Sequence, residues 1–213
     1  MPSQKFTKNV KLMLKYKIEY LMIKKLILMR HGESLANVLN IISEDKNGYP
    51  LTEKGMEQVL LSAEQLRDLK FNGIIASPIL RTSQTAKTVG DVIGLKVVES
   101  EKVRESGLGP YNGYNVNNVP KLSREDLGME SWNSQVKRMR SIIDDYDGCF
   151  IVVSHALPIK ALTASFLDMD ERESFGIDIK LASMTAIDVE NDKVLSVGTL
   201  LLTDKIKKLF STC

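Results

Sequence analysis

Two hydrophobic patterns alternate along the chain from residue 23 onward. Short apolar runs of buried-strand length cover residues 23–29, 73–76, 95–98, 149–153, 184–189 and 194–200. Between them, apolar residues recur at helical spacing over 52–69, 80–93 and 131–146, and a further helix is predicted from Pro158 to Leu167. This alternation predicts an α/β fold: a three-layer α/β/α sandwich with a mostly parallel sheet.

The first 21 residues follow a different pattern. Residues 10–20 alternate between apolar and mostly charged positions, with the period of two that is typical of a half-buried strand. Two interpretations remain open: an extra edge strand protected by its lysines, or a dispensable basic extension that ends where Met22 would be a natural start. We favour the extension, and therefore divide the chain into an extension over 1–21 and a single catalytic domain over 22–213.

Charge is unevenly distributed along the 213 residues, although the net charge is only +2. Residues 1–25 carry seven lysines and one glutamate, so the remainder is mildly acidic. This balance gives no general sign of a nucleic-acid partner. No apolar run reaches the roughly 18 residues of a membrane span, and no secretory signal is evident, so we expect no membrane partner and a cytoplasmic protein.

The two cysteines, Cys149 and Cys213, have neither the number nor the spacing of a disulfide framework or a metal site. We expect Cys149 to be a small packing residue in a buried strand and Cys213 to be a free thiol at the tail. Free thiols are typical of a reducing, cytosolic environment.

The first candidate catalytic residues are the two histidines of the chain and the residues next to them. His31 and His155 each come directly after an apolar run, and Arg30 precedes the first of them. Ligands of open α/β sheets bind at the carboxyl ends of strands, so we expect both imidazoles to face one pocket. Gly32 would let the backbone approach a ligand closely.

Two further segments contain candidate site residues. Arg81 lies near the start of a predicted helix that Ser77 could cap, where its guanidinium could bind an anion. Glu105 begins a glycine-rich irregular segment over 105–130. A glutamate with a raised pKa can donate a proton to an alkoxide leaving group, and long irregular segments are often functional.

Together these segments resemble the histidine phosphatase superfamily, also called the phosphoglycerate mutase-like family. The resemblance extends from Met22 to about Leu200 and rests on five motifs in the family's order. They are Arg30-His31-Gly32-Glu33-Ser34 with Asn37, Leu51-Thr52-Glu53-Lys54-Gly55 with Gln58, Ser77-Pro78 with Arg81-Thr82 and Gln84-Thr85-Ala86, Arg104-Glu105 with Gly109 and Gly113, and Val153-Ser154-His155.

The resemblance implies a role for each site residue. His31 would be the nucleophile that becomes phosphohistidine, and Glu105 would be the general acid and then the base. The phosphoryl oxygens would be bound by Arg30, Asn37, Arg81 and His155. No metal and no other cofactor would be needed, because arginine and imidazole groups supply the positive charge. The partner would be a small phosphorylated metabolite.

Within the family we favour a phosphomonoester phosphatase. A mutase usually has a longer insertion between the acid and the second histidine, with more basic residues; here only Lys121 and Arg124 are basic between Gly113 and Met129. The alternative is a phosphoglycerate mutase that depends on 2,3-bisphosphoglycerate. A non-catalytic binding module on the same fold is a remote third possibility.

The domain division predicts that a chain starting at Met22 folds and keeps its activity, because residues 1–21 contain no motif residue. Thermal unfolding and turnover of the full and shortened chains check this. A strongly lowered melting temperature would show instead that the alternating segment at 10–20 is an integral strand.

Overall fold

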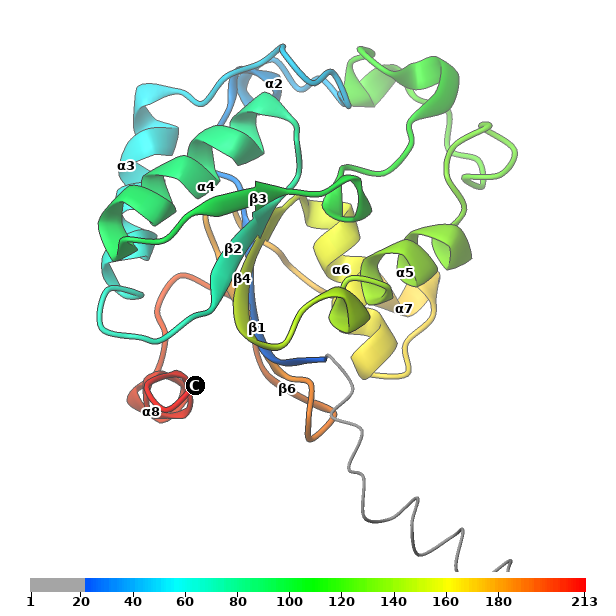
Figure 1. Ribbon diagram of the computed structural model, residues 1–213. Coiled ribbons are helices and arrows are strands. Elements are labelled where there is room, and N and C mark those ends of the chain that lie inside the picture. Colours follow the sequence, from blue (N-terminus) through cyan, green and yellow to red (C-terminus); the bar gives the residue numbers. More distant parts are fainter. Residues whose placement is uncertain (1–21) are drawn as a thin grey trace, which may run out of the picture.

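The computed structural model describes residues 22–213, and the predicted extension over 1–21 lies outside the described residues. Figure 1 shows a central twisted sheet with helices packed on both sides. Its six strands follow the order β3-β2-β4-β1-β5-β6. They span β1 Ile23–Arg30, β2 Gly73–Ala76, β3 Val97–Glu99, β4 Gly148–Ser154, β5 Met184–Asp188 and β6 Lys193–Thr199.

The sheet is mostly parallel, as predicted. Strand β1 pairs in parallel with β4, and β2 pairs in parallel with both β4 and β3. Strand β5 runs antiparallel to β1 and to β6. The short turn between β5 and β6 explains their antiparallel pairing, since a tight turn joins only antiparallel strands.

Helices cover the two faces of the sheet because side chains of a strand alternate between them. In β1, Leu26 and Leu28 belong to one core and Ile27 and Met29 to the other. The first core is completed mainly by α5 Trp132–Arg140 and α6 Ala156–Phe166, and the second by α3 Glu53–Glu64, α4 Leu80–Ile93 and α8 Asp204–Phe210. The predicted three-layer sandwich is therefore confirmed.

Several element boundaries differ from the prediction. Thr52 caps α3 as expected, accepting a hydrogen bond from Gly55 N at 3.0 Å, but the helix ends at Glu64 rather than at 69. Helix α5 ends at Arg140 and is followed by the short turn η4 Ile143–Asp145. Strand β3 begins at Val97, and α4 has the predicted bounds. The chain also forms the short helix α2 Leu35–Val38 after the His31 motif, and the helices α7 Glu171–Ser174 and α8 Asp204–Phe210, of which α7 and α8 were not predicted.

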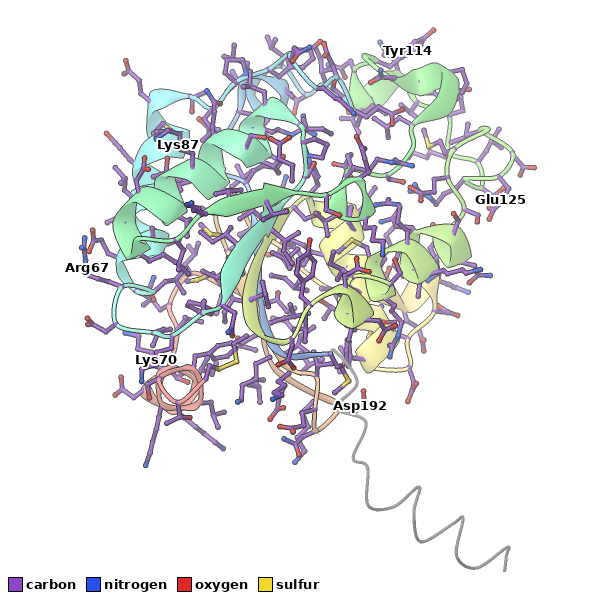
Figure 2. All side chains as sticks on the ribbon, in the orientation of Figure 1. Arg67, Lys70, Lys87, Tyr114, Glu125 and Asp192 are labelled. Atoms are coloured by element: carbon purple, nitrogen blue, oxygen red, sulfur yellow. A yellow bond between two sulfur atoms is a disulfide. The ribbon has the colours of Figure 1, made fainter. Side chains whose placement is uncertain are left out.

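The irregular segment over 105–130 lies beside the loop around residues 40–44. Backbone hydrogen bonds join Ile42 to Tyr114 and Gly113, and Glu44 Oε1 accepts from Leu108 N at 3.1 Å. The segment contains only the single turns η2 Gly109–Tyr111 and η3 Val116–Asn118, after η1 Glu101–Val103. Figure 2 shows Tyr114 and Glu125 of this segment at the rim of the molecule, projecting outward.

The expectation of free thiols is wrong. Cys149 and Cys213 form a disulfide across a sequence separation of 64 residues, with their Cα atoms 5.9 Å apart. Helix α8 brings the tail back to the start of β4, where Phe210 is buried and its ring lies 5.7 Å from that of Phe71. Since disulfides are typical of oxidising compartments or thermophilic proteins, the cysteines no longer support a cytoplasmic location.

A membrane-spanning helix is absent from the part of the chain that the structure describes: none of its helices is both long enough and apolar enough to cross a bilayer.

We predict that Cys213→Ser lowers the free energy of unfolding by about 4 kcal/mol, the loop-entropy expectation for a closed loop of this length. Denaturant unfolding of the wild type and the variant without reductant measures the difference. Adding reductant should bring the wild type close to the variant. Equal stability of the two oxidised proteins would contradict a structural role for this disulfide.

Candidate active site

The two histidines meet because β1 and β4 are neighbouring parallel strands. Arg30 is paired with Ser154 at the ends of these strands, and His31 N donates to Ser154 O at 3.1 Å. The ring centroids of His31 and His155 lie 5.3 Å apart, and both side chains are buried. The structure thus places the two imidazoles side by side at the carboxyl ends of these strands, and their facing a ligand pocket stays a prediction.

A backbone carbonyl orients the imidazole of His31. Nδ1 lies 2.7 Å from Gly32 O, which can only accept, so Nδ1 carries the proton in the neutral ring. The other nitrogen, Nε2, then has a free lone pair and accepts from Arg81 Nε at 3.2 Å. Nε2 is therefore the atom of His31 that can attack an electrophile.

Gly32 is required for helix packing. A Cβ atom there would collide with the carbonyl oxygen of Gly55 at the start of α3. The glycine thus allows α3 to pack closely against the loop that holds His31, and its expected role in the approach of a ligand stays a prediction.

Two arginines bring positive charge to the histidines. Arg81, in the first turn of α4, donates from Nη2 to Ser43 O at 2.8 Å and contacts His155 Nδ1 at 3.1 Å. Arg30 donates from Nη1 to Ile179 O at 2.7 Å. Each keeps one buried nitrogen without a hydrogen-bond partner among the described residues, Nε of Arg30 and Nη1 of Arg81. Unpaired buried donors are costly, so both favour an acceptor that enters from outside.

The same surroundings keep both imidazoles neutral. Burial, followed by the charges of Arg81 and Arg30, holds the pKa of His31 well below its ordinary value. Burial and the charge of Arg81 likewise hold the pKa of His155 well below its ordinary value. At neutral pH, His31 Nε2 is therefore unprotonated and nucleophilic.

Glu105 faces this cluster from the irregular segment. Its Oε2 lies 3.6 Å from His155 Nδ1 and 3.8 Å from Arg81 Nη2, while Oε1 accepts from Ser106 N at 2.9 Å. Burial raises the pKa of Glu105, and the charge of Arg81 is the largest effect opposing that rise. A carboxyl group with a raised pKa beside a nucleophile is suited to proton donation.

Asn37 and Ser77 form hydrogen bonds that were not predicted from the sequence. Asn37 Oδ1 accepts from Ser34 N at 3.0 Å, so this oxygen caps α2, and its role toward a phosphoryl group stays a prediction. Ser77 does not cap α4, whose N-cap is Ile79. Instead, Ser77 Oγ lies 2.9 Å from His155 Nε2 and orients that ring.

A buried ion pair that the sequence did not reveal supports Glu105. Arg138 of α5 binds both carboxylate oxygens of Glu130 at 2.8 Å and donates to Arg104 O at 3.1 Å. Glu130 in turn accepts from Gly107 N at 3.0 Å. These contacts fix the backbone on both sides of Glu105. No motif marks Arg138 or Glu130, because each acts through backbone groups that are distant in sequence.

The arrangement can bind a tetrahedral anion, attack it with a neutral imidazole and protonate its leaving group. Over residues 22–213, no group of three or more histidine, cysteine or acidic side chains is arranged to hold a metal ion. The positive charge of this site comes from the guanidinium groups of Arg30 and Arg81.

Comparison with known proteins identifies relatives of the whole catalytic region. Residues 26–199 match the family model described as histidine phosphatase superfamily, branch 1. A 2,3-bisphosphoglycerate-dependent phosphoglycerate mutase from Thermoplasma acidophilum is 38% identical over 191 residues, which are 85% of this chain and 96% of the relative.

Solved structures with the same fold include phosphatases. A phosphoserine phosphatase mutant from Entamoeba histolytica, in complex with phosphoserine, aligns with a TM-score of 0.71 and 24% identity, covering 84% of this chain and 98% of that protein. A mycobacterial glucosyl-3-phosphoglycerate phosphatase aligns with a TM-score of 0.65 and 23% identity, covering 78% and 94%. At these identities the likeness demonstrates the shared fold alone.

We predict that Glu105→Gln slows turnover of an alkyl phosphomonoester by about 10²- to 10⁴-fold, the usual contribution of a general acid. Turnover of p-nitrophenyl phosphate should fall far less, because p-nitrophenol leaves without a proton. Steady-state kinetics on both esters measure the two losses. Equal losses would mean that Glu105 serves binding or folding rather than proton transfer.

The pH profile provides a control for this prediction. The acid form of Glu105 is lost as pH rises through its raised pKa, so kcat/KM for the alkyl ester should fall on the basic side. Glu105→Gln should abolish this limb. His31 contributes no limb near neutral pH, because its lowered pKa leaves it neutral there.

Proposed function

Because the chain belongs to the histidine phosphatase superfamily, we propose that it moves a phosphoryl group from a small phosphomonoester to His31 and then to water. The observation that carries the proposal is a pair of buried nitrogens beside a neutral imidazole, Arg30 Nε and Arg81 Nη1, which have no hydrogen-bond partner within residues 22–213. Phosphoryl transfer needs a nucleophile and positive charge around the equatorial oxygens, and this site offers both.

In the first step, His31 Nε2 attacks phosphorus and the bond to the ester oxygen breaks. Arg30, Arg81 and His155 bind the phosphoryl oxygens, with Asn37 assisting. Glu105 donates its proton to the departing oxygen, so the alcohol leaves neutral. Arg81 already contacts His31 Nε2 at 3.2 Å, so its guanidinium lies next to the atom that would receive the phosphoryl group.

In the second step, the Glu105 carboxylate takes a proton from a water molecule that attacks the phosphohistidine. The nitrogen–phosphorus bond breaks, inorganic phosphate leaves and His31 returns to its neutral form. Glu105 is thereby protonated again and ready for the next turnover. Both steps use only side chains of this chain, and we therefore propose that no metal or other cofactor takes part.

A mutase is the second candidate, favoured by the 38% identity to a phosphoglycerate mutase along nearly the full length of that relative. His31 would then take its first phosphoryl group from 2,3-bisphosphoglycerate and return it to a hydroxyl of phosphoglycerate. The free donors of Arg30 and Arg81 fit a phosphoryl group in either case. Besides this donor, the two candidates differ in the acceptor that reaches phosphohistidine, which is water for the phosphatase and a hydroxyl of phosphoglycerate for the mutase.

The acceptor is identified by one comparison. We expect inorganic phosphate to be released from phosphomonoesters at a rate that EDTA leaves unchanged. Phosphate release is then compared with interconversion of 3- and 2-phosphoglycerate in the presence of 2,3-bisphosphoglycerate. Isomerisation much faster than hydrolysis would replace the phosphatase proposal by the mutase and leave the roles of His31 and Glu105 intact.

His31→Ala is the matched control for both candidates. It should abolish turnover and the acid-labile, base-stable phosphate label on the protein. His155→Ala should weaken catalysis while allowing slow labelling, because it removes a phosphoryl contact and not the nucleophile. An acid-labile, base-stable phosphate on His155 but not on His31 would reverse the two assignments.

A further inference from the structure

One guanidinium group of α5 binds the backbone that carries Glu105. Arg138 donates from Nη1 to Lys102 O at 2.8 Å and to Arg104 O at 3.1 Å, and from Nη2 to Glu105 O at 3.4 Å. Nη2 and Nε also donate to the two carboxylate oxygens of Glu130, each at 2.8 Å. A guanidinium group has five N–H donors, so each donor of Arg138 has an acceptor, and three of these are carbonyl oxygens of the loop over residues 102–108.

Glu130 binds the part of this loop that follows Glu105. Its Oε2 accepts from Gly107 N at 3.0 Å, and its own backbone N–H donates to Gly107 O at 2.8 Å. Burial alone would raise the pKa of Glu130, but the hydrogen bonds from Arg138 and Gly107 N hold it below its ordinary value. Glu130 is therefore ionised at neutral pH and serves as the acceptor for both groups.

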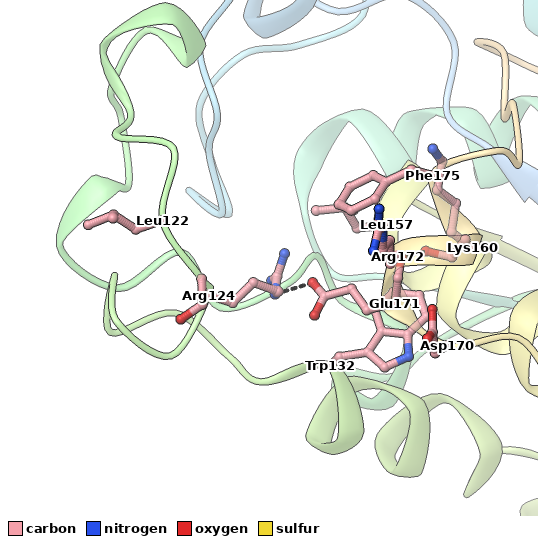
Figure 3. A pocket seen from close by; sticks show the side chains of 11 residues that line it. Leu122, Arg124, Trp132, Leu157, Lys160, Asp170, Glu171, Arg172 and Phe175 are labelled. Atoms are coloured by element: carbon pink, nitrogen blue, oxygen red, sulfur yellow. Dashed lines mark hydrogen bonds and ion pairs between the residues drawn. The ribbon is translucent and has the colours of Figure 1, made fainter.

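A second arginine attaches the same loop to α7. Arg124 donates from Nε to Glu130 O at 2.9 Å and from Nη2 to Ser106 Oγ. Figure 3 shows its side chain pointing toward Glu171, the first residue of α7, and the charged groups lie 3.8 Å apart. The loop is thus attached to α5 through Arg138 and to α7 through Arg124.

The carboxyl group of Glu105 has few contacts of its own. Within residues 22–213, Oε1 accepts one hydrogen bond, from Ser106 N at 2.9 Å, and Oε2 lies 3.6 Å from His155 Nδ1. The position of the carboxyl group therefore depends on the backbone that Arg138 and Glu130 hold. This matters because a misplacement of about 1 Å can cost on the order of 10²-fold in rate.

We propose that Arg138 and Glu130 are positioning residues for proton donation by Glu105, so that losing either slows the step that needs the acid and spares phosphate binding. The proposal rests on the proposed phosphoryl transfer at His31. It assigns the ion pair of α5 to one chemical event, the protonation of the leaving oxygen.

Arg138→Lys is the main test variant because it keeps the positive charge. Burial and then the charge of Arg81 lower the pKa of His155 most, and the charge of Arg138 adds to this, so a neutral residue would also alter His155. Lysine has three donors on one nitrogen and cannot replace the guanidinium fork. Arg140→Lys is the matched control: it makes the same change in α5 at a residue that donates to Ser165 O at 3.1 Å.

The test compares kcat/KM for phenyl phosphate and p-nitrophenyl phosphate. The two esters share the aromatic ring, but phenol is a far weaker acid than p-nitrophenol and needs the proton more. We expect Arg138→Lys to slow phenyl phosphate at least about tenfold more than p-nitrophenyl phosphate, as a misplaced acid would. Arg140→Lys should leave this ratio unchanged. The inhibition constant of inorganic phosphate, which has no leaving alcohol, should be the same in wild type and both variants.

A double-mutant cycle separates positioning from a general structural loss. If Arg138 acts through Glu105, adding Arg138→Lys to Glu105→Gln should cause almost no further loss on phenyl phosphate. Equal losses on both esters, or the same loss with and without Glu105, would overturn the proposal. Glu130→Gln has nearly the same shape as the natural side chain and completes the same cycle if Arg138→Lys fails to fold.

Failure of the proposed function gives a different result, because wild-type protein would then hydrolyse neither ester and gain no phosphate label on His31. Amide hydrogen exchange at Ser106 and Gly107, followed by NMR, needs no turnover and decides in that case whether Arg138 holds the loop. We expect exchange at least about tenfold faster in Arg138→Lys and unchanged in Arg140→Lys. Equal exchange in wild type and Arg138→Lys would refute the positioning.

Discussion

Two guanidinium groups lie in the candidate site, that of Arg81 buried and that of Arg30 half-buried, and among the described residues Glu105 is the carboxylate that lies within 4 Å of either. This imbalance of charge governs the chemistry around it. Removing a charged group from water costs several kcal/mol unless a partner replaces the lost hydration. Arg81 is only 3% exposed and has Glu105 at 3.8 Å, while Arg30 is held by a carbonyl oxygen. An anion that enters the site therefore gains from donors that the protein leaves unsatisfied.

The same imbalance determines the protonation states of the neighbouring groups. Positive charge and burial both disfavour imidazolium, so His31 and His155 stay neutral, and the Gly32 carbonyl leaves Nε2 as the nucleophilic nitrogen. Burial acts on Glu105 in the opposite direction and stabilises its protonated form against the nearby arginines. Burial therefore favours the neutral form of both the proposed nucleophile, His31, and the proposed acid, Glu105.

The architecture holds these groups together through the sheet and through α5. The register of β1 on β4 places Arg30 and His31 beside Ser154 and His155, and Ser154 Oγ donates to Val103 O at 2.7 Å, which ties the approach to Glu105 to the sheet. Arg138 and Glu130 then fix the loop on the far side of Glu105. The proposed acid, Glu105, is therefore held mainly through backbone groups on both sides of it.

The sequence alone determined the layered α/β fold and the residues that meet at the carboxyl ends of its strands. The periodic pattern of apolar and polar positions indicates which side chains of a strand or helix are buried, and this pattern can be read from neighbouring residues alone. His31, His155 and Arg81 were identifiable because each directly follows a strand or begins a helix, so the topology of the sheet brings them together.

Other contacts join side chains that are distant in sequence and do not follow from the order of strands and helices, and only the tertiary structure decided these. Arg138 and Glu130 support the proposed acid through backbone contacts, and Cys213 bonds to Cys149 after α8 folds back onto the sheet. The packing of α3 against Gly32 was likewise not predictable from the sequence. These pairings depend on how helices pack in space, and hydrophobic periodicity carries no information about that geometry.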